Sequence, residues 1–178
     1  MNFYPSKAVR LASVALIAIS GALPSLAHAA TAAPKASKAP KAHGKATMNT
    51  LALPSVSAQA GVAPVIGKPV GAAPTKLITK DIIVGKGQAA LTSSTVTAQY
   101  VVMSWKTGVV YQTSWTAQPF TAPLANLIAG WQQGIPGMKI GGRRLFIIPP
   151  ALAYGAQGAG NIPANETLVF VVDLLGVK

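Results

Sequence analysis

The sequence lacks most of the side chains that enzymes use for chemistry. Cysteine does not occur in the 178 residues, the only histidines are His28 and His43, and the only acids are Asp81, Glu166 and Asp173. Disulfides are therefore excluded, and beyond residue 43 the chain has no histidine or cysteine to act as nucleophile, general base or metal ligand. Any function of the second half of the chain must depend on the environment that its apolar side chains create.

Positive charge is unevenly distributed along the chain. The sequence has 15 lysine and arginine residues and a formal net charge of +12, and residues 1–75 contain no acid. Residues 76–178 hold eight of the basic residues together with all three acids. Because much of the excess charge lies outside the part predicted to fold, nucleic acid is not predicted as a partner. We expect Arg143 and Arg144, like the three acids, to be solvated at the surface.

Residues 1–29 have the organisation of a secretory signal peptide. Lys7 and Arg10 precede an apolar run from Leu11 to Leu23, and small residues at positions 27 and 29 suit a cleavage site. The run is shorter than the ~20 residues that a membrane-spanning helix needs. The pattern predicts a periplasmic or secreted protein, and the alternative is an uncleaved membrane anchor.

Residues 30–75 are rich in Ala, Pro and Lys. They contain no acid and no aromatic residue, and six prolines are spread between Pro34 and Pro74. With so little apolar bulk we expect a disordered linker. The four lysines from Lys35 to Lys45 could hold the protein weakly against an anionic envelope surface, or could serve only as a solvated tether.

Residues 76–178 are enough for one compact domain with its own core. From Thr95 to Met103 the side chains alternate between a more apolar and a less apolar face, and a Lys-Thr-Gly turn separates this segment from residues 109–114. These two segments predict a hairpin. Branched and aromatic residues predict further strands at 77–84, 142–148 and 167–175. The result is a largely antiparallel sheet of about five strands.

One segment has a helical period instead. Five apolar side chains share one helical face, at Leu124, Leu127, Ile128, Trp131 and Ile135, and Gly134 and Pro136 follow as helix-ending residues. We therefore predict an α+β fold in which an antiparallel five-stranded half-barrel sheet wraps around one short helix. The connection 151–166 is long and rich in Gly and Pro, and we expect it to form a lid over an apolar cavity.

The predicted strands, helix and loop of residues 76–178 carry aromatic and branched side chains, and this part of the chain has no histidine or cysteine. Taken singly, each is better explained by core packing, except Tyr154, whose hydroxyl-bearing ring has little packing reason to lie in a Gly-rich loop. Together they favour one reaction, rotation about the peptide bond that precedes proline. No bond is made or broken in this rotation and no proton moves, so it requires no cofactor and no metal.

Several motifs follow one another along residues 76–178. They are Tyr100 in a strand, Tyr111 opening the next strand, Gln118-Pro119-Phe120, Ile128-Ala129-Gly130-Trp131-Gln132-Gln133-Gly134, Ala153-Tyr154-Gly155, and Ile162-Pro163 followed by Thr167-Leu168-Val169-Phe170. In order and spacing these residues resemble the FKBP-type peptidyl-prolyl cis-trans isomerases. The resemblance covers nearly all of residues 76–178 and none of the leader or linker, so it implies one FKBP-type domain there.

The resemblance also implies roles for individual residues. In the pattern of that family, the proline ring of the substrate lies over the indole of Trp131. The walls of the pocket would be Tyr100, Tyr111, Phe120, Leu127, Ile128 and Phe170. The backbone N–H of Ile128 and the hydroxyl of Tyr154 would hydrogen-bond carbonyl groups of the substrate, and Ile162 would cap the site. Proline-containing polypeptides are the implied partners, and macrolides the implied inhibitors.

One departure from the family concerns the start of the second strand. Gln112 stands where the family usually has Asp, so a negative charge beside the hydroxyl of Tyr100 is missing. Two functions therefore stay open. One is an isomerase that assists the folding of exported proteins, and the other is a proline-binding chaperone module with weak or no turnover. No long dimerisation helix is visible in the sequence, which favours a monomer.

Overall fold

The computed structural model describes residues 52–178. The predicted signal peptide and residues 30–51 of the predicted linker lie outside the described residues. Within the described range, none of the helices is both long enough and apolar enough to cross a membrane.

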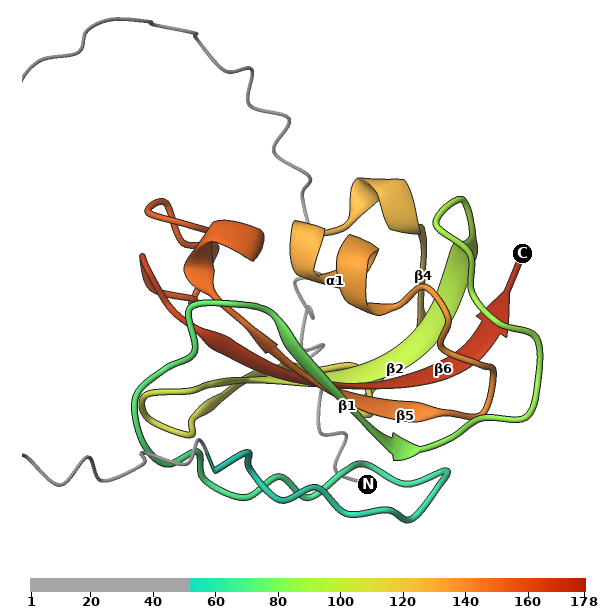
Figure 1. Ribbon diagram of the computed structural model, residues 1–178, viewed down its shortest axis with the longest axis horizontal. Coiled ribbons are helices and arrows are strands. Elements are labelled where there is room, and N and C mark those ends of the chain that lie inside the picture. Colours follow the sequence, from blue (N-terminus) through green and yellow to red (C-terminus); the bar gives the residue numbers. More distant parts are fainter. Residues whose placement is uncertain (1–51) are drawn as a thin grey trace, which may run out of the picture.

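An antiparallel sheet forms the body of the domain (Figure 1). Its strands are β1 (Ile78–Ile83), β2 (Thr95–Ser104), β3 (Val110–Thr113), β4 (Phe120–Pro123), β5 (Arg143–Ile148) and β6 (Leu168–Val177). They lie in the order β1-β5-β6-β2-β3, and β4 also pairs with β2. Because β3 pairs with the second half of β2 and β4 with its first half, the six strands occupy five positions. The predicted α+β fold is confirmed, and β4 is the strand that the sequence pattern did not indicate.

A short helix, α1 (Ala129–Gly134), lies on one face of the sheet, which we call the inner face (Figure 1). The 3-10 turn η1 (Leu124–Asn126) precedes it, and a second 3-10 turn, η2 (Pro150–Leu152), follows β5. The predicted helix is confirmed, but it is shorter than the segment from Leu124 to Ile135 over which the apolar spacing runs. Leu127 and Ile128 have extended backbones, with ψ of 170° and 148°, and they separate η1 from α1.

Two glycines let α1 approach the sheet closely. A Cβ atom on Gly130 would lie 2.5 Å from the side chain of Ile148, and one on Gly134 would lie 2.5 Å from the ring of Phe146. Real Cβ atoms do not approach other atoms so closely, so any larger residue would push α1 away from β5. The helix–sheet distance is therefore set by the absence of two side chains.

The main hydrophobic core lies between α1 and the inner face. It is built from alternate residues of the central strands, together with the residues that flank and form α1. Its buried members on the strands are Val96, Ala98, Tyr100, Val102, Phe146, Ile148, Leu168, Phe170, Val172 and Leu174. Trp131 and Ile135 reach this core from the helical segment, where they are 1% and 0% exposed.

The opposite, outer face of the sheet is also apolar and is covered by residues 52–75, which we call the strap (Figure 1). A second buried cluster on this face contains Met103, Trp105, Leu145, Ile147, Val169 and Val171. Leu53, Val56 and Ile66 of the strap pack against it, and the strap folds back on itself through bridges that pair Ala52 with Val70 and Val56 with Ile66. The structure thus differs from the expected disordered linker over residues 52–75. The strap has few large apolar side chains, but those it has are buried against the apolar outer face of the sheet, which stabilises its folded conformation.

Arg143 fastens the strap to the sheet, and the expectation that it is a solvated surface charge is wrong. Its guanidinium is fully buried and donates to both carboxylate oxygens of Asp173, at 2.6 and 2.8 Å. It also donates to the backbone oxygens of Ser57 at 2.8 Å and Val62 at 2.6 Å. Asp173 is likewise buried, at 7% exposure, so burial of both charges is offset by mutual pairing.

Candidate functional site

Four aromatic rings meet between α1 and the inner face. The indole of Trp131 lies 5.8 Å from the ring of Tyr100, 6.2 Å from Phe120 and 5.6 Å from Phe170, measured between centroids. All three rings are nearly perpendicular to the indole, with interplanar angles of 82° to 90°. Edge-to-face contacts of this kind hold each ring in one orientation. The resemblance placed these residues around one pocket, and the fold brings the four rings together in one aromatic cluster.

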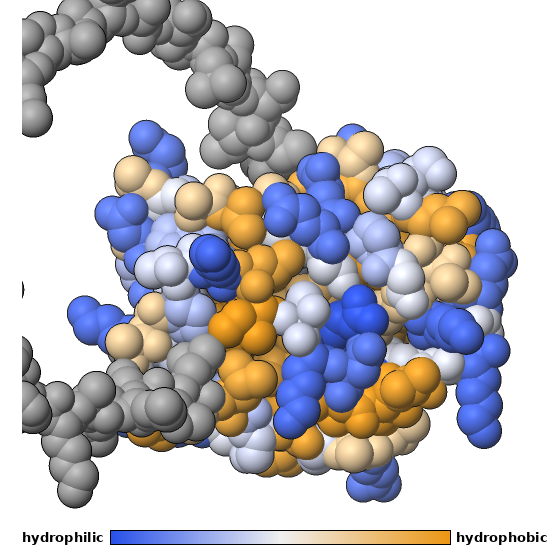
Figure 2. Space-filling model, viewed as in Figure 1, coloured by the Kyte–Doolittle hydropathy of each residue, from blue (hydrophilic) through white to orange (hydrophobic). Residues whose placement is uncertain are grey.

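The residues of the predicted site come from different elements, and they differ in exposure. Tyr100 lies on β2, Phe170 on β6, Trp131 on α1, and Leu127 and Ile128 in the link between η1 and α1; all five are buried. Four further members of the predicted site are only partly buried: Tyr111 on β3, Phe120 on β4, and Tyr154 and Ile162 in the loop after η2. The partly buried residues form a rim around a buried floor. On the face seen in Figure 2, apolar surface runs down the middle and is flanked by hydrophilic side chains.

The loop that follows η2 contributes two rim residues, Tyr154 and Ile162, and contacts β3. Its tip is a tight turn in which Ala159 and Ile162 exchange backbone hydrogen bonds of 3.0 and 2.8 Å. Asn161, at this tip, donates its side-chain N–H to the backbone oxygen of Tyr111 on β3, at 3.1 Å. Asn161 was not predicted as a site residue, although its place in a Gly-Asn turn pair is a signal for a sharp bend. Its hydrogen bond holds Ile162 beside the cluster.

Two groups of the site, the backbone N–H of Ile128 and the hydroxyl of Tyr154, are hydrogen-bond donors that can bind carbonyl oxygens. Within residues 52–178 the backbone N–H of Ile128 has no hydrogen-bond acceptor. Burial raises the pKa of Tyr154 to about 12, with a smaller contribution from the nearby Tyr100. Burial also raises the pKa of Tyr100 above its ordinary value of 10.0. Both hydroxyls therefore keep their protons at neutral pH and remain hydrogen-bond donors.

Gln112 lies beside this group without belonging to the hydrophobic cluster. It pairs with Val102 across β2 and β3 and is half-buried. Tyr100 is two residues from Val102 on the same strand and face, so Gln112 is a diagonal neighbour of Tyr100. The amide can donate or accept a hydrogen bond there, but it brings no charge to the site.

Ser114 anchors the backbone of Tyr100 from the loop after β3, and sequence reasoning missed it. Its hydroxyl oxygen accepts from the N–H of Tyr100 at 2.8 Å, its own N–H donates to the Tyr100 oxygen at 3.0 Å, and its hydroxyl donates to Gln99. A serine in a loop gives no sequence signal of such a role. The contact exists because the loop folds back onto β2.

Comparison with known proteins covers the part of the chain that carries this cluster. A model of the family described as FKBP-type peptidyl-prolyl cis-trans isomerase matches residues 86–175. A "Probable FK506-binding protein" of Corynebacterium glutamicum is 49% identical over 113 residues, which cover 63% of this chain and 96% of that protein. An "FK506-binding protein" of Streptomyces anulatus is 44% identical over 119 residues, covering 64% of this chain and 96% of that protein.

The fold leads to the same family. The crystal structure of FkpA from Escherichia coli superposes with a TM-score of 0.55 at 40% sequence identity, over 58% of this chain and 49% of that one. The family model spans half of the sequence, from the segment before β2 to Leu175 within β6, and so includes every residue of the aromatic cluster. The chain belongs to the FKBP-type peptidyl-prolyl cis-trans isomerases.

Proposed function

We propose that the aromatic cluster is the site at which this protein rotates peptide bonds that precede proline, in polypeptides that are being folded after export. The observation that carries the proposal is the cluster itself: a buried indole ringed by three perpendicular aromatic rings, with a half-buried rim under a tethered loop. Such a site is suited to an apolar five-membered ring. Export rests on the leader sequence at residues 1–29.

The reaction needs an environment and no proton transfer. Rotation about the bond faces a barrier of about 18–20 kcal/mol because the planar amide has partial double-bond character. The planar form is more charge-separated than the twisted form, so an apolar site disfavours the ground state relative to the transition state. A gain of about 5 kcal/mol would accelerate the exchange several thousand-fold.

The two donors of the site would hold the peptide while the bond turns. We assign the N–H of Ile128 and the hydroxyl of Tyr154 to carbonyl oxygens on either side of the proline. Fixing both flanks restricts motion to the one bond that must rotate. Gln112 would leave this mechanism intact, because a neutral amide still hydrogen-bonds and no step requires a carboxylate.

In the described conformation the indole is covered, so a substrate must open the site before it reaches Trp131. Only 1% of Trp131 is exposed, so a proline ring must spread the rim residues before it can lie on the indole. Phe120, Tyr154 and Ile162 are partly exposed and come from a sheet edge and a loop, which are the parts of a fold that move most easily. Macrolides, the ligands in the names of the relatives, would compete for the same opening.

A cis/trans exchange assay tests the proposal directly. We expect the protein to accelerate exchange in a peptide of the Ala-Leu-Pro-Phe type, and a Trp131→Ala variant to lose most of this acceleration. Folding of the variant is checked by circular dichroism. Binding of the peptide without acceleration would overturn the isomerase assignment and leave the alternative of a proline-binding chaperone module.

A further inference from the structure

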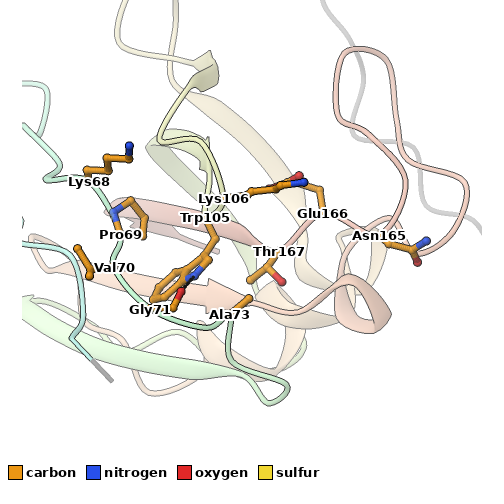
Figure 3. Close-up of a pocket in the computed structure, with 10 residues that line it drawn as sticks. All are labelled: Lys68, Pro69, Val70, Gly71, Ala73, Trp105, Lys106, Asn165, Glu166 and Thr167. Atoms are coloured by element: carbon orange, nitrogen blue, oxygen red, sulfur yellow. Dashed lines mark hydrogen bonds between the residues drawn. The ribbon is translucent and has the colours of Figure 1, made fainter. Parts of the chain in front are cut away.

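A second concave region lies where the strap meets the turn after β2 and the segment that leads into β6. Its cavity has a volume of about 630 Å³. The strap contributes Lys68, Pro69, Val70, Gly71 and Ala73, the turn contributes Trp105 and Lys106, and the lead-in to β6 contributes Asn165, Glu166 and Thr167 (Figure 3). None of these residues belongs to the aromatic cluster.

A second cavity adjoins this one and is lined in part by η2 and the loop that follows it. The second cavity has a volume of about 530 Å³ and shares Ala73, Asn165 and Thr167 with the first. Its remaining lining residues are Pro74, Thr75, Pro149, Pro150, Ala151, Gly155 and Ala156. The two cavities thus form one groove, the strap groove, with residues 68–75 on one side and the loop that carries Tyr154 on the other.

Hydrogen bonds fix the walls of the strap groove. The indole N–H of Trp105 donates to the backbone oxygen of Gly71 at 3.2 Å, and its backbone N–H donates to the oxygen of Thr167 at 3.0 Å. The N–H of Asn165 donates to the oxygen of Gly155 at 2.8 Å. The strap, the turn after β2 and the loop are therefore held together, and the groove is a formed feature of the fold.

The charge around the groove favours an acidic occupant. Lys68 and Lys106 line it with exposed side chains, and Glu166 is its one acidic residue. The carboxylate of Glu166 accepts a hydrogen bond of 2.7 Å from the buried hydroxyl of Ser104, so one of its oxygens is directed towards the protein. Over residues 52–178, nine basic residues face three acids, and the other two acids are paired with the two arginines. Seven lysines therefore remain in this range, and Glu166 is its one acid that is not paired with an arginine.

We propose that the strap groove binds an acidic, extended stretch of the same polypeptide whose proline occupies the aromatic cluster. The inference rests on the proposed function and adds a substrate preference to it. Gly155 lines the groove and is the immediate neighbour of Tyr154, so a client chain that leaves the aromatic cluster past the loop meets the groove next. Two adjoining cavities suit an extended backbone, and the lysines that line the groove suit Asp or Glu side chains near the proline.

The test uses two long peptides and one short one. Both long peptides contain the core Ala-Leu-Pro-Phe with flanking segments on each side, rich in Glu in one peptide and in Gln in the other; the short peptide is the neutral core alone. We expect the KM of the Glu peptide to be about threefold to tenfold lower than that of the Gln peptide, the range expected for a few solvent-exposed ion pairs.

Two double variants separate the groove from the overall charge. In Lys68→Glu/Lys106→Glu the preference for the Glu peptide should disappear, whereas Lys86→Glu/Lys139→Glu changes the net charge equally at exposed lysines elsewhere and should keep it. Turnover of the short peptide should be the same in both. Equal loss of preference in the two variants, or no preference in the unchanged protein, overturns the proposal.

Failure of the proposed function gives a different result. If no peptide is accelerated, the isomerase assignment of the cluster falls, and calorimetric binding of the Glu peptide then decides on the groove. Binding that only Lys68→Glu/Lys106→Glu abolishes supports the groove, and binding that is absent or that both variants weaken equally overturns it.

Discussion

Both faces of the sheet are apolar, but different segments cover them and cover them to different extents. On the inner face, α1 leaves a rim of partly exposed aromatic side chains around a buried indole. On the outer face, the strap covers the apolar side chains, and a buried ion pair ties it down at Arg143. The rim of the inner face suits the proposed proline site, and the buried contacts at Arg143 on the outer face contribute stability. We therefore expect changes at the rim to affect turnover, and changes at the buried ion pair to affect unfolding.

The largest effect is expected from Arg143→Met. This change leaves the carboxylate of Asp173 and two strap carbonyls buried without their partner, and loss of one member of a buried ion pair costs about 3–5 kcal/mol of unfolding free energy. Urea unfolding measures this loss. The neighbouring Arg144→Met is the matched control. It loses a pair with the partly exposed Asp81 and one hydrogen bond to the oxygen of Gly134, which together should contribute about 1–2 kcal/mol.

The same variant tests the separation of the two faces. If the faces are independent, folded Arg143→Met protein keeps its isomerase kcat/KM. A loss of activity in proportion to the loss of stability would show instead that the strap supports the aromatic cluster. Ser114 gives a physical route for such coupling, because its hydroxyl bonds to both Gln99 and the Tyr100 backbone, and Gln99 pairs with Asp173 across the sheet.

A smaller loss of stability is expected from Gly134→Ala. The new Cβ would lie 2.5 Å from the ring of Phe146, so α1 or the ring must shift, at a cost of about 1–3 kcal/mol. Because Trp131 is on the same helix, kcat/KM should fall as well. Gln133→Ala, on the exposed side of α1, should leave both quantities unchanged. A stable and active Gly134→Ala protein would contradict the close helix–sheet contact.

Tyr154→Phe should separate activity from stability on the inner face. Removal of the hydroxyl leaves the ring to pack, so the unfolding free energy should change little. Loss of one hydrogen bond to the substrate, worth about 1.4 kcal/mol, lowers kcat/KM about tenfold. The exchange assay measures this directly, and an unchanged rate would remove the hydroxyl from the mechanism.

The smallest effect is expected from pH. No side chain of the aromatic cluster titrates near neutrality, and the pKa values of Tyr100 and Tyr154 are raised, so kcat/KM should be nearly flat between about pH 6 and 8. A bell-shaped profile in that range would contradict a mechanism without proton transfer.

The raised pKa of Tyr154 should make the stability of the fold decline in alkali. The folded pKa of Tyr154 is about 12 and its ordinary value is 10.0, so above pH 10 the unfolded chain releases this proton more readily than the folded one. The contribution of the buried, protonated hydroxyl is thus complete below pH 10 and is lost as the pH rises towards 12. Unfolding by urea at increasing pH should show this decline, and Tyr154→Phe should reduce it.

The sequence predicted the inner face better than the outer face. Alternation located β2, the content of branched and aromatic residues located β5 and β6, and the helical period located α1. The aromatic motifs indicated the members of the cluster. β4 was missed because its four residues, Phe-Thr-Ala-Pro, are too few to show alternation and end in proline. Asn161 and Ser114 were missed because their roles depend on the segments that the loops fold against.

The outer face shows why composition can mislead. Val101 and Met103 on β2, and Val169 and Val171 on β6, are apolar on the side away from α1, which is a sign that something covers that side. The covering segment has little apolar bulk and several prolines, so taken alone it has the composition of a linker. Pro54, Pro64 and Pro69 are nevertheless buried in the strap, where its extended backbone suits proline.

By itself the sequence predicted the fold class and the residues of the aromatic cluster, because apolar periods and the motifs that resemble the family are local properties of the chain. Only the tertiary structure decided where the domain begins, which arginine is buried, and how the rim closes over Trp131. Those features depend on pairs of segments far apart in the sequence, such as Arg143 with Ser57 and Asn161 with Tyr111. Neither segment of such a pair carries a signal until the fold brings them together.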